Sequence, residues 1–204
     1  MNAILSYLIQ MLLPALAGAV LWAVFRPLRR RRHVRRGLTA GDYREGVLLI
    51  YVMFLAGLLA LTLTPAGFWP ALLRGEKPVM PPAFQGGINL VPITRSVELF
   101  QYYLRHGLWS AIWVNFPGNI VMFMPIGFFI GLLSDKPRWW KGALSALLLS
   151  VFIETMQLFV SRGTDVDDLI LNTLGGLAGY WVFLLVRRWA PHFTAQCKLR
   201  KGRV

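Results

Sequence analysis

The sequence predicts an all-α fold: a polytopic membrane helical bundle of about five transmembrane helices, with an amphipathic interfacial helix in the outer loop. Three observations support this fold class. Hydrophobic residues make up 56% of the 204 residues, and the mean hydropathy of +0.53 is high for a soluble globular domain. Five separate stretches are long and apolar enough to cross a bilayer. The basic residues gather between alternate stretches, as the positive-inside rule requires.

The five apolar stretches are residues 4–25, 47–64, 112–133, 142–160 and 169–186. Each has the length of a membrane crossing at ~1.5 Å per residue. A soluble domain of this size could not bury all five. The first stretch is predicted to be a retained anchor, because its positive charge follows the apolar run, whereas a cleaved signal peptide carries that charge ahead of it.

Seventeen of the 22 Lys and Arg residues lie on one side of the membrane if the five stretches alternate in direction. They fall in residues 26–44, in residues 136–141 and in the tail from residue 187. This bias predicts an N-terminus outside and a C-terminus in the cytoplasm. The net charge of +13 is therefore explained by topology and by contact with anionic lipid head groups, and we expect no nucleic-acid partner.

The outer loop between the second and third stretches has two halves. Residues 65–93 are rich in Pro and Gly, which predicts irregular, turn-bearing structure. In residues 94–111, apolar residues recur at helical spacing, which predicts an amphipathic helix in the outer interface or a short re-entrant segment. The apolar positions are Val97, Phe100, Leu104, Leu108 and Ala111.

Polar residues interrupt the fourth and fifth stretches near their outer ends. Glu154 and Gln157 are three residues apart, so they share one face of a helix. Asp165, Asp168 and Asn172 follow a spacing of three and four, which again places them on one face. A carboxylate within a membrane span must face the bundle interior or a wet cavity and needs a partner. These residues therefore predict a ligand-binding site.

The third stretch and the connecting turn complete this polar layer. Asn119 lies one helical turn after another Asn, and Arg162 is the predicted partner of Glu154. At ~1.5 Å per residue, the layer lies about 7–10 Å below the outer surface. Structural roles are also open: acids at 165–168 stabilise a helix start, and an Asn can simply bond to a neighbouring helix.

Two pairs of glycines have the spacing typical of close helix contacts in membranes. They are Gly127 with Gly131 and Gly175 with Gly179. Small residues at this spacing let helix backbones approach each other. We therefore expect close helix contacts at both pairs.

The segment "NIVMFMPIGF" from Asn119 and the segment "IETMQLFVSRGTDVDDLILNTLGGLAGY" from Ile153 resemble the VanZ-like family of bacterial membrane proteins. The "NLVPI" segment from Asn89 is also similar, and the resemblance covers roughly residues 45–186. It implies a multi-pass protein of the cell envelope, in the bacterial cytoplasmic (inner) membrane. Because the family is named for low-level resistance to teicoplanin, it also implies a link to glycopeptide resistance. It implies no reaction and no catalytic residues.

Three regions are expected. Residues 1–44 form a transmembrane anchor and an Arg-rich cytoplasmic loop, residues 45–186 the VanZ-like transmembrane domain, and residues 187–204 a basic cytoplasmic tail. The expected function is binding of a lipid head group or a cell-wall-related ligand in the outer leaflet. The expected partners are membrane lipids, including a lipid-linked cell-wall intermediate, and neither a cofactor nor a metal is expected.

Two alternatives remain open. The first is an intramembrane enzyme acting on a lipid-linked phosphate, with Glu154 as general base and a divalent cation held by Asp165, Asp168 and Asn172. It is disfavoured because the polar layer has no His, no Cys and no Ser with a base to activate it. The second is a proton-coupled transporter that uses Glu154.

Overall fold

The structure of the chain is a computed structural model that describes residues 3–65, 67–78, 82–84, 87–160 and 163–201. Within these residues, five helices are long and apolar enough to cross a membrane. The predicted all-α fold class is thus confirmed. The chain divides into two compact units. Unit 1 comprises residues 1–81, 132–135 and 189–204, and unit 2 comprises residues 82–131 and 136–188.

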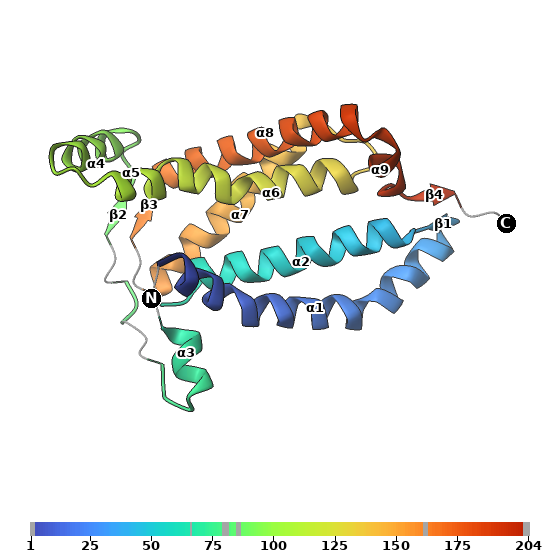
Figure 1. The fold of residues 1–204 in the computed structure, drawn as a ribbon, viewed down its shortest axis with the longest axis horizontal. Coiled ribbons are helices and arrows are strands. Elements are labelled where there is room, and N and C mark those ends of the chain that lie inside the picture. The colour runs from blue at the N-terminus through green and yellow to red at the C-terminus, as the bar shows by residue number, and fades with distance from the viewer. Residues whose placement is uncertain (1–2, 66, 79–81, 85–86, 161–162, 202–204) are drawn as a thin grey trace. The chain divides into compact units, whose positions relative to one another are not determined.

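Unit 1 is built on an antiparallel hairpin of two long helices, α1 (Ala3–Arg35) and α2 (Asp42–Leu63) (Figure 1). The helices approach closely at Gly18, where an added Cβ would lie 3.0 Å from the Cβ of Ala56. Helix α1 continues through most of the arginine run, because Arg is a good helix former. Much of the segment expected as a loop is therefore helical. A short helix, α3 (Phe68–Leu73), follows α2.

Two of the chain segments rich in basic residues, residues 26–44 and the tail, meet at one end of unit 1. Strand β1 (Leu38–Thr39) pairs antiparallel with β4 (Arg200–Lys201), and the short helix α9 (Pro191–Gln196) precedes β4. The ring of Tyr43 at the start of α2 packs edge-on against Phe193 of α9, with centroids 6.3 Å apart. The first basic segment and the tail, which were expected on the same side of the membrane, therefore lie together.

Two cations bind backbone carbonyls at this end. Arg44 donates from Nη1 to the carbonyl oxygens of Leu133 and Cys197, both at 2.8 Å. Lys198 donates from Nζ to the carbonyl oxygens of Leu132 at 2.8 Å and of Ser134 at 2.6 Å. The last carbonyls of a helix have no partner within it and carry partial negative charge. Both cations therefore donate hydrogen bonds to the carbonyls at the C-terminal end of α6.

Unit 2 is centred on α6 (Pro117–Leu133, apart from its last two residues), α7 (Trp139–Phe159) and α8 (Val166–Trp189). Helices α6 and α8 touch through glycine. A Cβ built on Gly127 would overlap the carbonyl oxygen of Gly176, and one built on Gly179 would overlap that of Met124. The expected close helix contacts at these glycines are confirmed, and the structure shows that they join α6 to α8.

Helix α7 joins this contact through small residues. A Cβ on Gly176 would lie 2.5 Å from the Cβ of Ala146 and 2.8 Å from the carbonyl oxygen of Gly142. One glycine of α8 therefore serves two helix contacts. Around it the core is apolar, with Phe123, Ile126 and Phe183 almost fully buried.

The segment expected as one amphipathic helix over 94–111 forms two helices, α4 (Thr94–Arg105) and α5 (Trp109–Asn115). The expected single helix is wrong at its C-terminal end because Gly107 adopts φ +65°, a left-handed conformation that ends a helix. Along α4, Val97, Phe100 and Leu104 remain 40–45% exposed. This exposed apolar stripe is what an interfacial helix presents to lipid.

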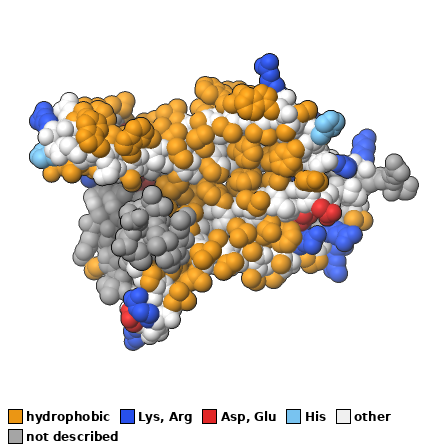
Figure 2. Space-filling model, viewed as in Figure 1, with side chains coloured by type: hydrophobic (Ala, Val, Ile, Leu, Met, Phe, Trp, Pro, Cys, Tyr) orange, Lys and Arg blue, Asp and Glu red, His pale blue; other side chains and the backbone are white. Residues whose placement is uncertain are grey.

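Two further short strands join distant parts of unit 2. Strand β2 (Ile88–Asn89) pairs parallel with β3 (Thr164–Asp165), so that Asn89 lies opposite Asp165. The pairing brings the outer loop to the start of α8. On the face shown in Figure 2, hydrophobic side chains run along the long helices, and charged groups gather near helix ends.

The glycine contact predicts a sharp difference between two Gly→Ala substitutions. We expect Gly127→Ala to destabilise the protein by about 3 kcal/mol, because overpacking forces backbones apart. Gly46→Ala is the control: Gly46 lies in α2 with nothing within 4 Å of an added Cβ, and the change should stabilise by up to about 1 kcal/mol through helix propensity. Thermal unfolding in detergent measures both. Equal stability of the two variants would contradict the close contact.

Candidate functional site

Glu154 stabilises the turn between α7 and α8 by hydrogen bonds. Its Oε2 accepts a hydrogen bond from the backbone N–H of Asp165 at 3.1 Å, and its backbone carbonyl accepts one from the Thr164 hydroxyl at 3.1 Å. The side chain is only 5% exposed. Its expected partner, Arg162, lies outside the described residues. Gln157, one turn further along α7, is half-buried.

Asp165 interacts with residues of the outer loop. Its Oδ1 accepts hydrogen bonds from Asn89 Nδ2 at 2.9 Å and from the backbone N–H of Asp167 at 3.0 Å. Its Oδ2 lies 3.9 Å from Nε of Arg95, whose side chain is 50% exposed. An ion pair of this length and exposure contributes little stability. Arg95 can therefore turn toward a ligand at small cost.

Asp167 fixes the start of α4, a role that the sequence did not predict. The carboxylate is 5% exposed. It accepts a hydrogen bond from the backbone N–H of Ile93 at 2.6 Å and another from the Ser96 hydroxyl. Ile93 adopts φ +70°, which is strained for a β-branched residue. A buried charge-assisted hydrogen bond offsets that strain and holds α4 against the start of α8.

Asn119 and Asp168 link α6 to α8. Asn119 donates from Nδ2 to Oδ1 of Asp168 at 2.7 Å. This bond follows from the glycine contact: Asn119 precedes Gly127 by two helical turns, as Asp168 precedes Gly176. Because α6 and α8 run parallel at that contact, the two polar residues fall opposite each other, about 12 Å along the helices from the glycines.

Asn172 lies one turn deeper than Asp168 and faces α7. It is 4% exposed and donates from Nδ2 to the fully buried Ser150 hydroxyl at 2.8 Å. Its Oδ1 has no hydrogen-bond partner among the described residues. Asn172 therefore bonds to a neighbouring helix and does not join Asp165 and Asp168 at one point. Across the described ranges, no group of three His, Cys, Asp or Glu side chains could hold a metal ion.

A cavity of about 190 Å³ opens between the start of α4, α5 and the start of α8. Of the predicted site residues, it is lined by Asp165 and Asp168. Asn119, Glu154, Gln157 and Asn172 are not in its lining. Asn115, one helical turn before Asn119, also lines it, and the structure adds Ser96, Leu99 and Phe116, which no periodic pattern marks. The complete lining is Arg95, Ser96, Leu99, Asn115, Phe116, Gly163, Thr164, Asp165, Asp168 and Leu171.

The cavity therefore combines three kinds of group. Arg95 supplies a cation, Asp165 and Asp168 supply carboxylates, and Leu99 and Phe116 supply apolar surface. Such a wall can bind a polar group that has both an anionic part and hydrogen-bond donors, attached to an apolar body.

The contacts of Asp167 predict that it controls the order of α4. In Asp167→Asn, the amide presents a donor where the carboxylate accepted two bonds, so we expect faster amide hydrogen exchange over residues 94–105. Glu98→Gln removes the same charge from α4 itself and is the control. Hydrogen exchange read by mass spectrometry distinguishes them. Unchanged exchange in Asp167→Asn would contradict the anchoring role.

One protein-family match covers all the residues of this site. A family profile described as VanZ/LLP1 matches residues 47–187. Searches of curated proteins and of solved structures each found no match. The matched region covers well over half of the 204 residues and includes α5 to α8 with the cavity between them and α4. The chain is therefore a multi-pass membrane protein that belongs to the VanZ/LLP1 family.

Proposed function

We propose that the cavity of unit 2 binds the polar head group of a membrane lipid or of a lipid-linked cell-wall intermediate, in the outer leaflet. The observation that carries this proposal is a cavity of mixed charge beside an exposed apolar helix face. Arg95 would contact a phosphate, and Asp165 and Asp168 would accept hydrogen bonds from amine, amide or hydroxyl groups. The exposed stripe on α4 would lie against the acyl chains.

The structural residues of the polar layer support this division of roles. Glu154, Asp167 and Asn119 each bond to another part of unit 2, so they hold the cavity wall in place. Arg95 has the weakest of these contacts, an ion pair at 3.9 Å. A residue with a weak internal contact is free to contribute to ligand binding. A lipid-linked cell-wall intermediate in this cavity would also account for a role in glycopeptide resistance.

Lipid retention tests the site. In native mass spectrometry, which counts bound lipids, we expect Arg95→Gln to lose at least about nine-tenths of one phosphorylated lipid per chain that wild type carries. One charged hydrogen bond contributes ~1.5–3 kcal/mol, and 1.4 kcal/mol is tenfold in affinity. Arg105→Gln, the same change on the same helix but outside the cavity, should keep the lipid. Equal retention in both variants would contradict the proposal.

We also propose that the basic end of unit 1 faces the cytoplasm and the cavity of unit 2 faces outside. The supporting observation is the charge bias: 17 of the 22 Lys and Arg residues lie in the segments assigned to the inner side. Two of these segments, residues 26–44 and the tail, meet at one end of unit 1, where Arg44 binds the carbonyl of Cys197.

Thiol labelling in intact cells tests this orientation. We expect a membrane-impermeant maleimide to label Lys77→Cys directly and Arg36→Cys only after the membrane is opened. Background from Cys197 should be small, because the residue is fully buried and burial raises the pKa of its thiol. Less of the reactive thiolate is then present at neutral pH. The reverse labelling pattern would overturn the orientation.

A further inference from the structure

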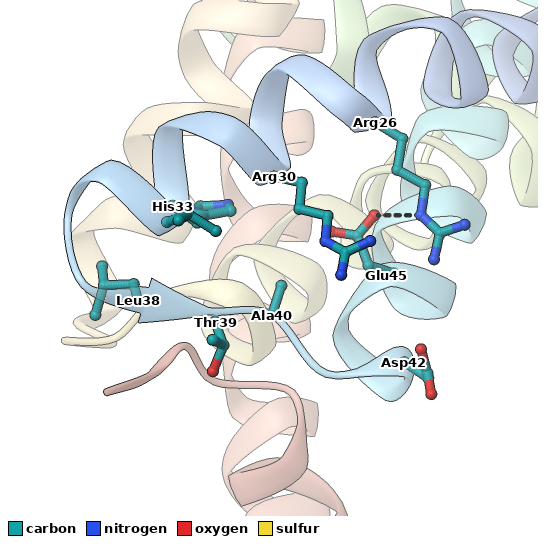
Figure 3. Close-up of a pocket in the computed structure, with 9 residues that line it drawn as sticks. Arg26, Arg30, His33, Leu38, Thr39, Ala40, Asp42 and Glu45 are labelled. Carbon is teal, nitrogen blue, oxygen red and sulfur yellow. Dashed lines mark ion pairs between the residues drawn. The ribbon is translucent and has the colours of Figure 1, made fainter. Parts of the chain in front are cut away.

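Unit 1 has a cavity of its own, of about 230 Å³, at the basic end of the α1–α2 hairpin. It lies between the last turns of α1, strand β1 and the first turn of α2 (Figure 3). The lining residues that can carry charge are Arg26, Arg30, His33, Asp42 and Glu45. Because all of them belong to unit 1, the cavity is separate from the site proposed above.

The two acidic residues of this cavity are each stabilised by nearby groups of unit 1. Glu45 is held by two arginines of α1, since its Oε2 lies 3.2 Å from Nη2 of Arg29 and 3.7 Å from Nε of Arg26. Asp42 and Glu45 both occupy the first turn of α2, where acids favour the positive end of the helix dipole. The positive charge of Arg29 is thus already matched by Glu45.

Arg30 is different. Arg30 lines the cavity together with Glu45 (Figure 3). No hydrogen bond or ion pair joins Arg30 to any described residue. Residues 26–45 contain eight Arg against two acids, so an excess of positive charge surrounds the cavity. An anion with several oxygen acceptors would satisfy Arg30 and share the donors of Arg26, as phosphate does at arginine sites.

The position of the cavity along α1 indicates where that anion comes from. The turns just before it carry exposed apolar side chains, Val24, Phe25 and Leu28, as expected for a surface that faces lipid. Trp22 lies under both Arg26 and Arg29, at 5.2 and 5.6 Å from the guanidinium carbons to the ring, and Trp favours the level of the head groups. The cavity therefore adjoins the exposed apolar surface of α1.

From this geometry we propose that the cavity at Arg26 and Arg30 binds the phosphate of an anionic membrane lipid, whose acyl chains lie along the exposed face of α1. The Asp42 carboxylate and the Thr39 hydroxyl, both in the lining, can bond to hydroxyl groups of such a head group. A head group with a net negative charge is favoured, because a quaternary ammonium would meet the arginine excess.

The test uses the full chain in detergent and measures lipid binding by native mass spectrometry. The probes are phosphatidylglycerol, phosphatidylcholine with the same acyl chains, and inorganic phosphate as a competitor. The variants are Arg30→Gln and its matched control Arg32→Gln, which removes the same charge two residues away from a position outside the cavity. Arg95→Gln separates this site from the cavity of unit 2.

We expect phosphatidylglycerol to bind in preference to phosphatidylcholine. Arg30→Gln should weaken that binding about tenfold, as the loss of one charged contact predicts, while Arg32→Gln and Arg95→Gln retain it. Equal weakening in Arg30→Gln and Arg32→Gln would show a diffuse charge effect and overturn the site, as would no weakening in either. Displacement of the lipid by millimolar inorganic phosphate would overturn the lipid assignment and identify a soluble phosphate compound. Loss in Arg95→Gln alone would place the anionic lipid in unit 2 and also overturn this inference.

Discussion

The contact of α6 with α8 at Gly127 and Gly176 is the constraint on which the rest of unit 2 depends. With no side chain between them, the two backbones meet directly in the observed register. That register carries Asn119 to Asp168 two turns away. It also places Gly142 of α7 against Gly176, so that the same contact sets the position of the third helix. In a membrane, such packing replaces the hydrophobic effect as the source of helix association.

The buried polar groups build on this frame, because each needs a partner in a medium without water. Glu154 bonds to the backbone at Asp165, Asp167 to the first turn of α4, and Asn172 to Ser150. Glu154 and Asn172, which the sequence predicted to bind a ligand, therefore have structural partners. The charged groups left to face the cavity are fewer: Arg95, Asp165 and Asp168, and both carboxylates already have contacts within unit 2.

Unit 1 follows a related principle at its basic end. Arg44 and Lys198 bind the carbonyls at the end of α6, and Arg26 and Arg29 bind Glu45. These four cations near the helix ends therefore have a structural use. Arg30 lines a cavity beside Glu45, and no described residue binds it.

The sequence by itself determined the membrane class, the five apolar helices, the close glycine packing and the presence of a polar layer. These features depend on hydropathy, length and spacing along one helix, which are local properties. Only the tertiary structure decided which polar groups meet. Asp167 bonds to Ile93 and Ser96, more than 70 residues earlier in the chain, and Arg95 enters the cavity through the same distant loop. It also decided that Gly107 divides the amphipathic segment. Partner choice across such separations depends on the packing of whole helices, which no local pattern records.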